Sequence, residues 1–151
     1  MIEQLPYVSQ IDVRPIEGGS NLWEHGRHIG VYWRQYCEPQ EWIEISTGLS
    51  SNKGHYQYVL LHELAHSTGI GPRLARPGLY QSNESVLSQE ELIADLAATS
   101  LMEELDIRSD QELKDVILHR FHKRCSELQW DDKLIKEATR SAYKAVKYIL
   151  R

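Results

Sequence analysis

Two histidines four residues apart, with a glutamate between them, are the residues of this sequence best suited to chemistry. The segment His62-Glu63-Leu64-Ala65-His66 is an HExxH pattern. On a helix, residues four apart lie on the same face, so both imidazoles can bind one metal ion. Zinc accepts neutral imidazole nitrogen at about 2.0–2.1 Å. We therefore expect His62 and His66 to bind one zinc ion per chain.

Glu63 follows His62 directly and lies one position further round the predicted helix. It can reach a water molecule at the metal without becoming a ligand, which suits a general base. In peptide hydrolysis Glu63 would take a proton from that water and deliver it to the leaving amine. The alternative is that His62 and His66 are ordinary surface or core histidines of a helix that binds no metal.

A catalytic zinc site has three protein ligands and one open position, so a third ligand must come from elsewhere in the chain. Glu91 and Asp95 are four apart and share a helix face; one carboxylate could bind zinc while the other accepts a hydrogen bond from a ligating imidazole. Alternatively, Ser88 and Glu91 form a capping box, with Glu91 tied to the backbone N–H of Ser88. The full set of candidates is Glu84, Glu90, Glu91, Asp95, His119 and His122.

A short basic cluster spans residues 119–124 and contains His119 and His122, three apart. The neighbouring cations Arg120, Lys123 and Arg124 disfavour a second metal ion there, so we interpret the cluster as a solvated helix face. His119, His122 and Tyr80 are candidates for the donor to the substrate carbonyl oxygen, but the sequence does not choose between them. Binding of the cluster to a phosphate backbone is a further alternative.

The elements that position these residues divide into a strand-rich first third and a helical remainder. Hydrophobic patterns and turn residues predict strands over about 7–13, 28–33 and 41–46, and the short connections between them favour antiparallel pairing. Helices are expected over about 54–68 and 89–105, then after Ser109 and from about 131, with an irregular loop over 71–87. Asn52 is the expected N-cap of the first helix, and Ser109 with Glu112 forms a capping-box pattern.

Length and composition fit one globular domain over residues 1–151, because 41% of the residues are hydrophobic and 26% are charged. No stretch approaches the roughly 20 apolar residues of a membrane span, and the N-terminus lacks the pattern of a signal peptide. The net charge of −5 argues weakly against nucleic acid as a partner. Cys37 and Cys125 are expected to be unpaired thiols of a cytoplasmic protein. The oligomeric state is not predicted.

Three ordered motifs resemble the C-terminal metallopeptidase domain of the antirestriction protein ArdC and related domains of phage and plasmid polyvalent proteins. The family pattern is HELxHxTG, then RLxR, then EELxAEL. A weaker similarity runs to the ImmA/IrrE peptidases and to thermolysin-type zincins, in which a glutamate on a second helix completes the site. In this sequence the motifs are residues 59–69, 73–76 and 89–98, and residues 36–45 resemble the strand before the zinc helix.

This resemblance implies an α+β, zincin-like fold, with a small antiparallel sheet over the HExxH zinc helix and further C-terminal helices. It favours Glu91 as the third zinc ligand and Asp95 as the carboxylate that supports an imidazole. Residues 41–46 become the candidate edge strand for an extended peptide substrate. Asp95 stands where the family has glutamate, which shortens the supporting side chain. The single-strand-DNA-binding domain of ArdC has no counterpart here, so a free-standing peptidase module is expected.

The leading functional hypothesis is therefore a zinc metallopeptidase that cleaves a peptide or protein substrate, encoded by a phage or plasmid and acting against host factors. A rival hypothesis from a different class is a non-catalytic zincin scaffold that binds and inhibits a host restriction or defence factor. A third is a single-strand nucleic-acid binder, whose affinity would weaken steeply with salt. The natural substrate and the host process are not predicted.

Overall fold

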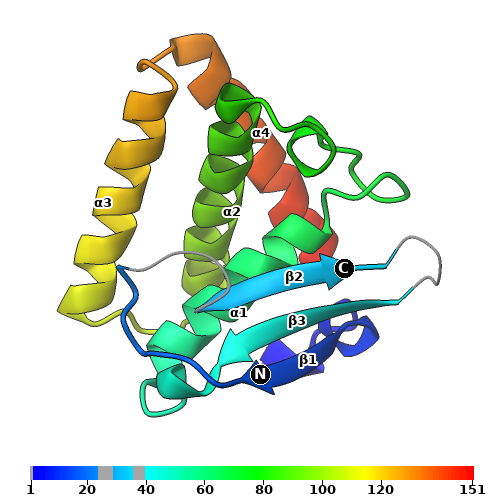
Figure 1. The fold of residues 1–151 in the computed structure, drawn as a ribbon, viewed down its shortest axis with the longest axis vertical. Helices are drawn as coiled ribbons and strands as arrows, with labels where there is room; N and C mark the ends of the chain where they lie inside the picture. Colours follow the sequence, from blue (N-terminus) through cyan, green and yellow to red (C-terminus); the bar gives the residue numbers. More distant parts are fainter. Residues whose placement is uncertain (1, 24–28, 36–39) are drawn as a thin grey trace.

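A computed structural model describes residues 2–23, 29–35 and 40–151 of the chain. Three strands precede four helices, with short 3₁₀ turns between some of them (Figure 1). This is the expected α+β class. The strands are β1 (Asp12–Ile16), β2 (Gly30–Arg34) and β3 (Glu41–Ser46), and the helices are α1 (Lys53–Ser67), α2 (Glu84–Glu104), α3 (Gln111–Glu127) and α4 (Asp132–Ile149).

The sheet has the order β1-β3-β2, with β2 antiparallel and β1 parallel to β3. The prediction of a wholly antiparallel sheet is therefore wrong. The short connection between β2 and β3 does give antiparallel pairing, but the 13 residues between β1 and β2 are enough for β2 to skip a position in the sheet. As a result, β3 is the central strand and not the predicted edge strand, while β2 forms one edge of the sheet.

The first strand begins later than predicted, because Val8–Gln10 forms a 3₁₀ turn and β1 covers Asp12–Ile16. Pro15 lies inside β1, where it pairs with Ile45 of β3. Proline has no backbone N–H, but a strand at the edge of a sheet needs no donor on its outer side. The other two strands lie close to their predicted positions, although His28, the first residue of the predicted second strand, falls outside the described residues.

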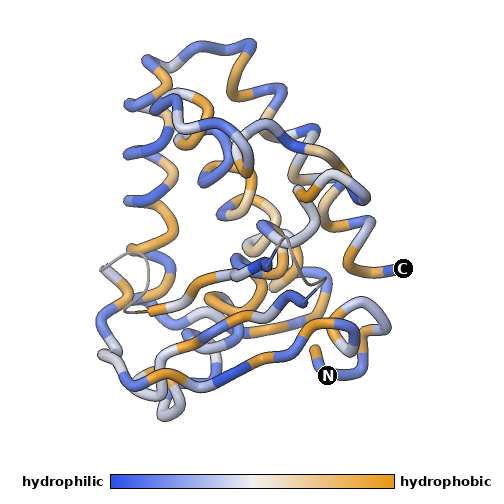
Figure 2. Tube along the Cα trace, turned by 45° about the vertical axis from the view of Figure 1, so that its right-hand side comes forward, coloured by the Kyte–Doolittle hydropathy of each residue, from blue (hydrophilic) through white to orange (hydrophobic). Residues whose placement is uncertain are grey.

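Helix α1 is the central element, with the sheet on one side and α2 and α4 on the other (Figure 1). Its residues from Gln57 to Ser67 are all buried, as expected for a helix enclosed on every side. Ile43 and Ile45 of β3 supply the buried face of the sheet. In Figure 2 the hydrophobic residues of α3 turn toward the neighbouring helices and its hydrophilic residues toward the outside. Both faces of α1 are thus fixed by packing.

The helix caps decide one of the alternatives left open by the sequence. Asn52 caps α1, as predicted, by accepting a hydrogen bond from the His55 backbone N–H at 3.1 Å. Helix α2, however, begins at Glu84 with Asn83 as its N-cap, so Ser88 lies inside the helix and donates to Glu127 at 2.8 Å. The capping box of Ser88 and Glu91 is therefore not formed, because asparagine caps a helix one turn earlier.

The two C-terminal helices also begin at short polar caps. Asp110 caps α3 by accepting a hydrogen bond from the Leu113 N–H at 2.8 Å, in place of the predicted cap Ser109. Asp131 caps α4, close to the predicted start. Cys125 is buried and has a free thiol among the described residues, which do not include Cys37. In the part of the chain that the structure describes, no helix has the length and apolar character to cross a membrane.

Candidate metal centre

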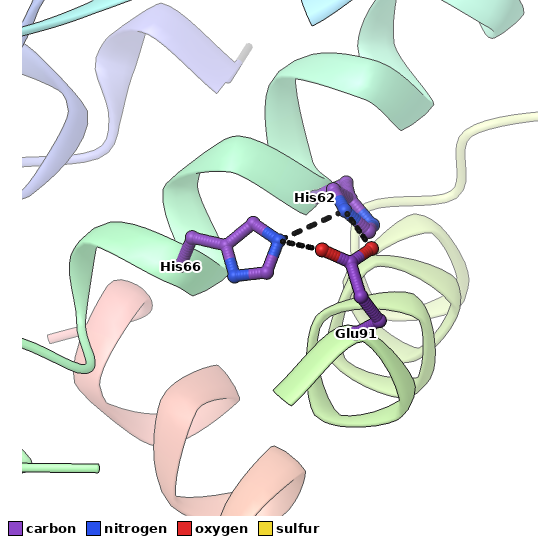
Figure 3. Close-up of side chains that lie close together, drawn as sticks. All are labelled: His62, His66 and Glu91. Carbon is purple, nitrogen blue, oxygen red and sulfur yellow. Dashed lines mark hydrogen bonds and ion pairs between the residues drawn. The ribbon is translucent and has the colours of Figure 1, made fainter. Parts of the chain in front are cut away.

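Three potential ligand atoms converge between α1 and α2 (Figure 3). His62 and His66 project from successive turns of α1, and their Nε2 atoms lie 3.0 Å apart. Glu91 projects from α2 with one carboxylate oxygen toward each imidazole. Its Oε2 lies 3.4 Å from His62 Nε2, and its Oε1 lies 3.4 Å from His66 Nε2. The structure therefore brings together the three residues that the sequence and the resemblance nominated as metal ligands.

These separations fit a single small metal ion. Ligand atoms at about 2.0–2.2 Å from a tetrahedral zinc lie roughly 3.3–3.6 Å from one another. The distance from each imidazole to the Glu91 oxygen that faces it falls in this range, and the distance between the two Nε2 atoms is slightly shorter. Two imidazoles and one carboxylate are also a donor set that zinc accepts in catalytic sites. The residues present thus fit zinc.

Asp95 supports His62 from the side of the ring away from the ligand atoms. Its Oδ1 lies 2.9 Å from His62 Nδ1, close enough for the carboxylate to attract an imidazole proton, although His62 Nδ1 forms no hydrogen bond among the described residues. The same oxygen accepts hydrogen bonds from the Tyr58 hydroxyl and the Arg120 Nε, both at 2.9 Å. Asp95 therefore stands beside His62 in the buried position expected for a supporting carboxylate.

Glu90 supports His66 from the Nδ1 side of the ring, a contact that was not predicted from the sequence. Its Oε1 lies 3.0 Å from His66 Nδ1, within hydrogen-bonding distance, while Glu91 faces the Nε2 of the same ring. Glu90, a candidate ligand in the sequence, is therefore turned toward the Nδ1 of His66 and not toward the Nε2 that faces the ligand centre. Adjacent carboxylates on α2 therefore contact the two nitrogens of one imidazole.

The two arginines of the RLxR motif fix the end of α1. The buried Arg76 donates to both carboxylate oxygens of Glu90 at 2.8 Å, and also to Ala65 O at 2.6 Å and Thr68 Oγ1 at 2.7 Å. Arg73 donates to Ser67 O at 2.8 Å and forms an ion pair with Glu41 of β3. The last carbonyls of a helix lack backbone donors within it, and Arg73 supplies a donor to that of Ser67. Arg76 adds a further donor to Ala65 O, so both arginines tie the end of α1 to its neighbours.

The charges of the carboxylates and imidazoles at the ligand centre compensate one another. Burial raises the pKa of the Glu91 carboxyl, but His66 and His62 lower it by more, so that it lies well below its ordinary value. In the same way, burial raises the pKa of Glu90, which Arg76 and His66 then lower to below its usual range. For His66, burial lowers the pKa, but Glu91 and Glu90 raise it well above the ordinary value. Ionised carboxylates therefore surround imidazoles on which protons and a metal ion would compete.

Glu63 lies in the cavity beside the three ligand candidates. The cavity has a volume of about 460 Å³, and its walls come from β2, α1, α2, α3 and the turn at Pro77–Leu79. Gly30 lets β2 approach α1 here: an added Cβ would lie 2.5 Å from Val59 Cγ1 and 3.5 Å from Glu63 Cγ. The apolar residues of the walls include Ile29, Val31, Leu79 and Leu87.

The other residues considered from the sequence lie outside this cavity. Glu84 is exposed at the start of α2. His119 and His122 are exposed and contact the rings of Trp23 and Trp130, with centroids 5.3 and 5.6 Å apart. Half-exposed Tyr80 is hydrogen-bonded to the backbone N–H of Gly71.

Arg120 and Arg124 of α3 line the cavity instead of the two histidines. The whole basic cluster was predicted to be a solvated helix face, and for these two residues that interpretation is wrong. They are four apart and therefore share a face of α3, whereas His119 and His122 lie on another. That spacing was the available signal, and only the orientation of α3 shows which face is turned inward.

Comparisons with known proteins agree with this geometry. A family model described as a zincin-like metallopeptidase matches residues 36–140. Among solved structures, the chain resembles the antirestriction ArdC protein from the R388 plasmid, in a metal-free crystal structure, with a TM-score of 0.61 and 22% identity. The match covers 93% of this chain and 46% of that chain, so it spans less than half of that protein and shows the fold alone. A search of curated proteins gives no match.

Proposed function

Because the chain belongs to the zincin-like metallopeptidase family, we propose that it is a zinc-dependent peptidase. Its zinc would be held by His62, His66 and Glu91, with Glu63 as the general base. The observation that carries the proposal is the convergence of three ligand atoms from α1 and α2, with Glu63 lining the same cavity. Zinc, when bound, supplies Lewis-acid chemistry, which polarises a carbonyl group and lowers the pKa of water.

Glu63, Asp95 and Glu90 then have separate roles in hydrolysis. Glu63 accepts a proton from the attacking water, whose oxygen forms a bond to the carbonyl carbon of the substrate. The bond between carbon and nitrogen breaks, and Glu63 returns the proton to the leaving amine. Glu90 holds the Nδ1 side of His66 by a hydrogen bond, and the Asp95 carboxylate lies beside Nδ1 of His62. Both contacts favour the orientation in which the Nε2 atoms face the ligand centre.

The edge strand β2 is the candidate binding surface for an extended peptide. Among the described residues β2 pairs with β3 alone, and residues 29–32 line the cavity. Backbone groups at the free edge of a sheet can pair with an added strand. This assigns to β2 the role that the sequence analysis gave to residues 41–46. The apolar walls formed by Ile29, Leu79 and Leu87 favour an apolar substrate side chain.

The test is zinc-dependent cleavage that requires Glu63. Purified protein of known zinc content is incubated with a peptide library, and the products are identified by mass spectrometry. We expect cleavage that a chelator abolishes, that added zinc restores, and that Glu63→Gln lacks. Absence of cleavage by wild-type protein carrying one zinc per chain, across substrates that include proteins from cells expressing the chain, would contradict the proposal.

A second candidate function is suggested by the structural similarity to an antirestriction protein. In that case the chain would bind a restriction or defence factor and would need no hydrolysis. Protection against restriction, measured in cells that express wild-type or Glu63→Gln protein, separates the two functions. Protection that survives Glu63→Gln favours binding, and protection that disappears while zinc content and fold are unchanged favours hydrolysis.

A further inference from the structure

Two arginines of α3 lie beside the ligand centre. Arg120 Nη2 and Arg124 Nη2 lie 3.7 and 3.6 Å from Glu91 Oε2. That same oxygen lies 3.4 Å from His62 Nε2, so both guanidinium groups reach the immediate surroundings of the centre. Both residues line the cavity. Glu63, in contrast, lies beside β2, where Gly30 approaches it.

The contacts of the two arginines differ. Arg120 donates from Nε to Asp95 Oδ1 at 2.9 Å, so it belongs to the group that positions His62. Arg124 donates from Nη1 to Glu127 at 3.1 Å, a partner one turn away whose side chain is 34% exposed. The Nε of Arg124 is buried and has no hydrogen-bond partner among the described residues. Arg124 is thus held at the cavity by a surface carboxylate, and part of its donor capacity is unused.

Arg124 is not required to neutralise the carboxylates of the site. Glu90 is paired with Arg76, and Asp95 is paired with Arg120. Glu91 would be neutralised by the metal ion that it binds. A guanidinium this close to a cation opposes metal binding, so charge balance in the resting site does not explain the position of Arg124. The guanidinium becomes stabilising when negative charge develops on a substrate oxygen during the reaction.

We propose that Arg124 is a substrate-binding residue, whose guanidinium donates a hydrogen bond to the carbonyl oxygen of the peptide bond being cleaved. This inference rests on the proposed hydrolytic function. With Glu63 beside β2 and Arg124 on α3, the carbonyl group lies between the base and the donor. Arg124 thereby takes the role for which the sequence analysis considered Tyr80, His119 and His122, none of which lines the cavity.

The test compares Arg124→Met with Lys123→Met, which removes a charge from an exposed neighbouring position on α3. For Arg124→Met we expect kcat to fall by about 100- to 1,000-fold, the range found when one oxyanion donor is removed. A phosphinic peptide, which mimics the charged transition state, should bind the zinc-loaded variant much more weakly than the zinc-loaded wild type. Affinity for the product fragment that carries the new amino terminus should stay close to the wild-type value, because this fragment has no oxygen from the cleaved carbonyl group. Lys123→Met should change neither affinity, and the zinc content of both variants should match the wild type.

Phosphinic peptide binding by calorimetry provides a readout that does not depend on turnover. If Arg124→Met does not fold, Arg124→Lys is tested in its place. We expect the phosphinic peptide affinity of Arg124→Lys to fall by at least about tenfold, because lysine lacks the planar fork of donors. Unchanged kcat and unchanged phosphinic peptide affinity in a folded Arg124 variant would overturn the inference while leaving the proposed function intact. No zinc-dependent cleavage by the wild-type chain would instead contradict the proposed function, and this inference with it.

Discussion

Glu90 Oε1 lies 3.0 Å from Nδ1 of His66, so the buried carboxylate holds the imidazole by the nitrogen that faces away from the ligand centre. A ring that donates its Nδ1 proton leaves the lone pair of Nε2 free for a metal. Glu90 is itself held by two hydrogen bonds from Arg76, which also binds the end of α1. One chain of contacts therefore connects the RLxR motif to the orientation of a proposed zinc ligand.

This connection predicts that Glu90→Gln weakens zinc binding without removing a ligand. The amide is a weaker acceptor than the carboxylate and raises the basicity of the imidazole less, so zinc affinity should fall by about 10- to 100-fold. Competition with a chromophoric chelator measures the affinity. Glu84→Gln, at the exposed start of the same helix, is the control and should bind zinc like the wild type. Equal affinities of both variants would contradict the role of Glu90.

The neighbouring acidic residues Glu63 and Glu91 should respond differently to substitution. Glu91→Ala removes a proposed ligand and should lower the zinc content well below one ion per chain. Glu63→Gln removes the proposed base, so it should retain zinc and fold while the cleavage rate falls by orders of magnitude. Elemental analysis of desalted protein and peptide cleavage assays separate the two effects. Stoichiometric, tightly held zinc in Glu91→Ala would show that another residue completes the site.

A third prediction concerns the close approach of β2 to α1. Gly30→Ala would place a methyl group 2.5 Å from Val59 Cγ1, within a packed region. Overpacking of this kind costs about 1–3 kcal/mol, and displacement of β2 should also weaken peptide binding at its edge. Gly19→Ala is the matched control, because its Cβ would meet nothing closer than a backbone atom at 4.0 Å. Urea denaturation of both variants gives the comparison, and equal stabilities would argue against the tight contact.

The HExxH helix and the place of Glu63 on it could be predicted from the sequence because both depend on residues close together in the chain. Spacing fixes which residues of α1 share a face, and Gly69 and Asn52 mark its boundaries. The role of Glu90 could not be predicted in this way. Glu90 and Glu91 both lie on α2, and only the packing of α2 on α1 decides which nitrogen of His66 each one meets. Arg124 depends in the same way on the orientation of α3.

The sheet illustrates a second limit of sequence reasoning. Strand periodicity identified β3 with its observed bounds, and the short connection correctly paired it with β2. The position of β1 depends on a longer connection, whose length permits several strand orders. Periodicity says which residues are buried in a strand but does not say which strand lies beside it. The edge strand at the cavity was therefore assigned to β3 when it is β2.

The last prediction concerns Asp110, which joins the starts of α1 and α3. Its carboxylate accepts a hydrogen bond from the Leu113 backbone N–H and contacts the His55 ring and the Asn52 amide. Hydrogen bonding to His55, followed by Leu113 and Asn52, lowers the pKa of Asp110 from 3.8 to about 2. Because the unfolded chain takes up this proton first, the stabilisation is complete above pH 3.8 and is lost as the pH falls towards about 2.

Asp110→Asn should therefore be less stable than the wild type at pH 5, and the difference in the free energy of unfolding should shrink as the pH falls from 3.8 to about 2. Urea denaturation of metal-free protein at several pH values measures it, since zinc release then makes no contribution. Asp132→Asn, an exposed change in the first turn of α4, is the control. A difference between wild type and Asp110→Asn that stays constant from pH 5 to pH 2 would show that the Asp110 carboxylate does not link the two helices through its charge.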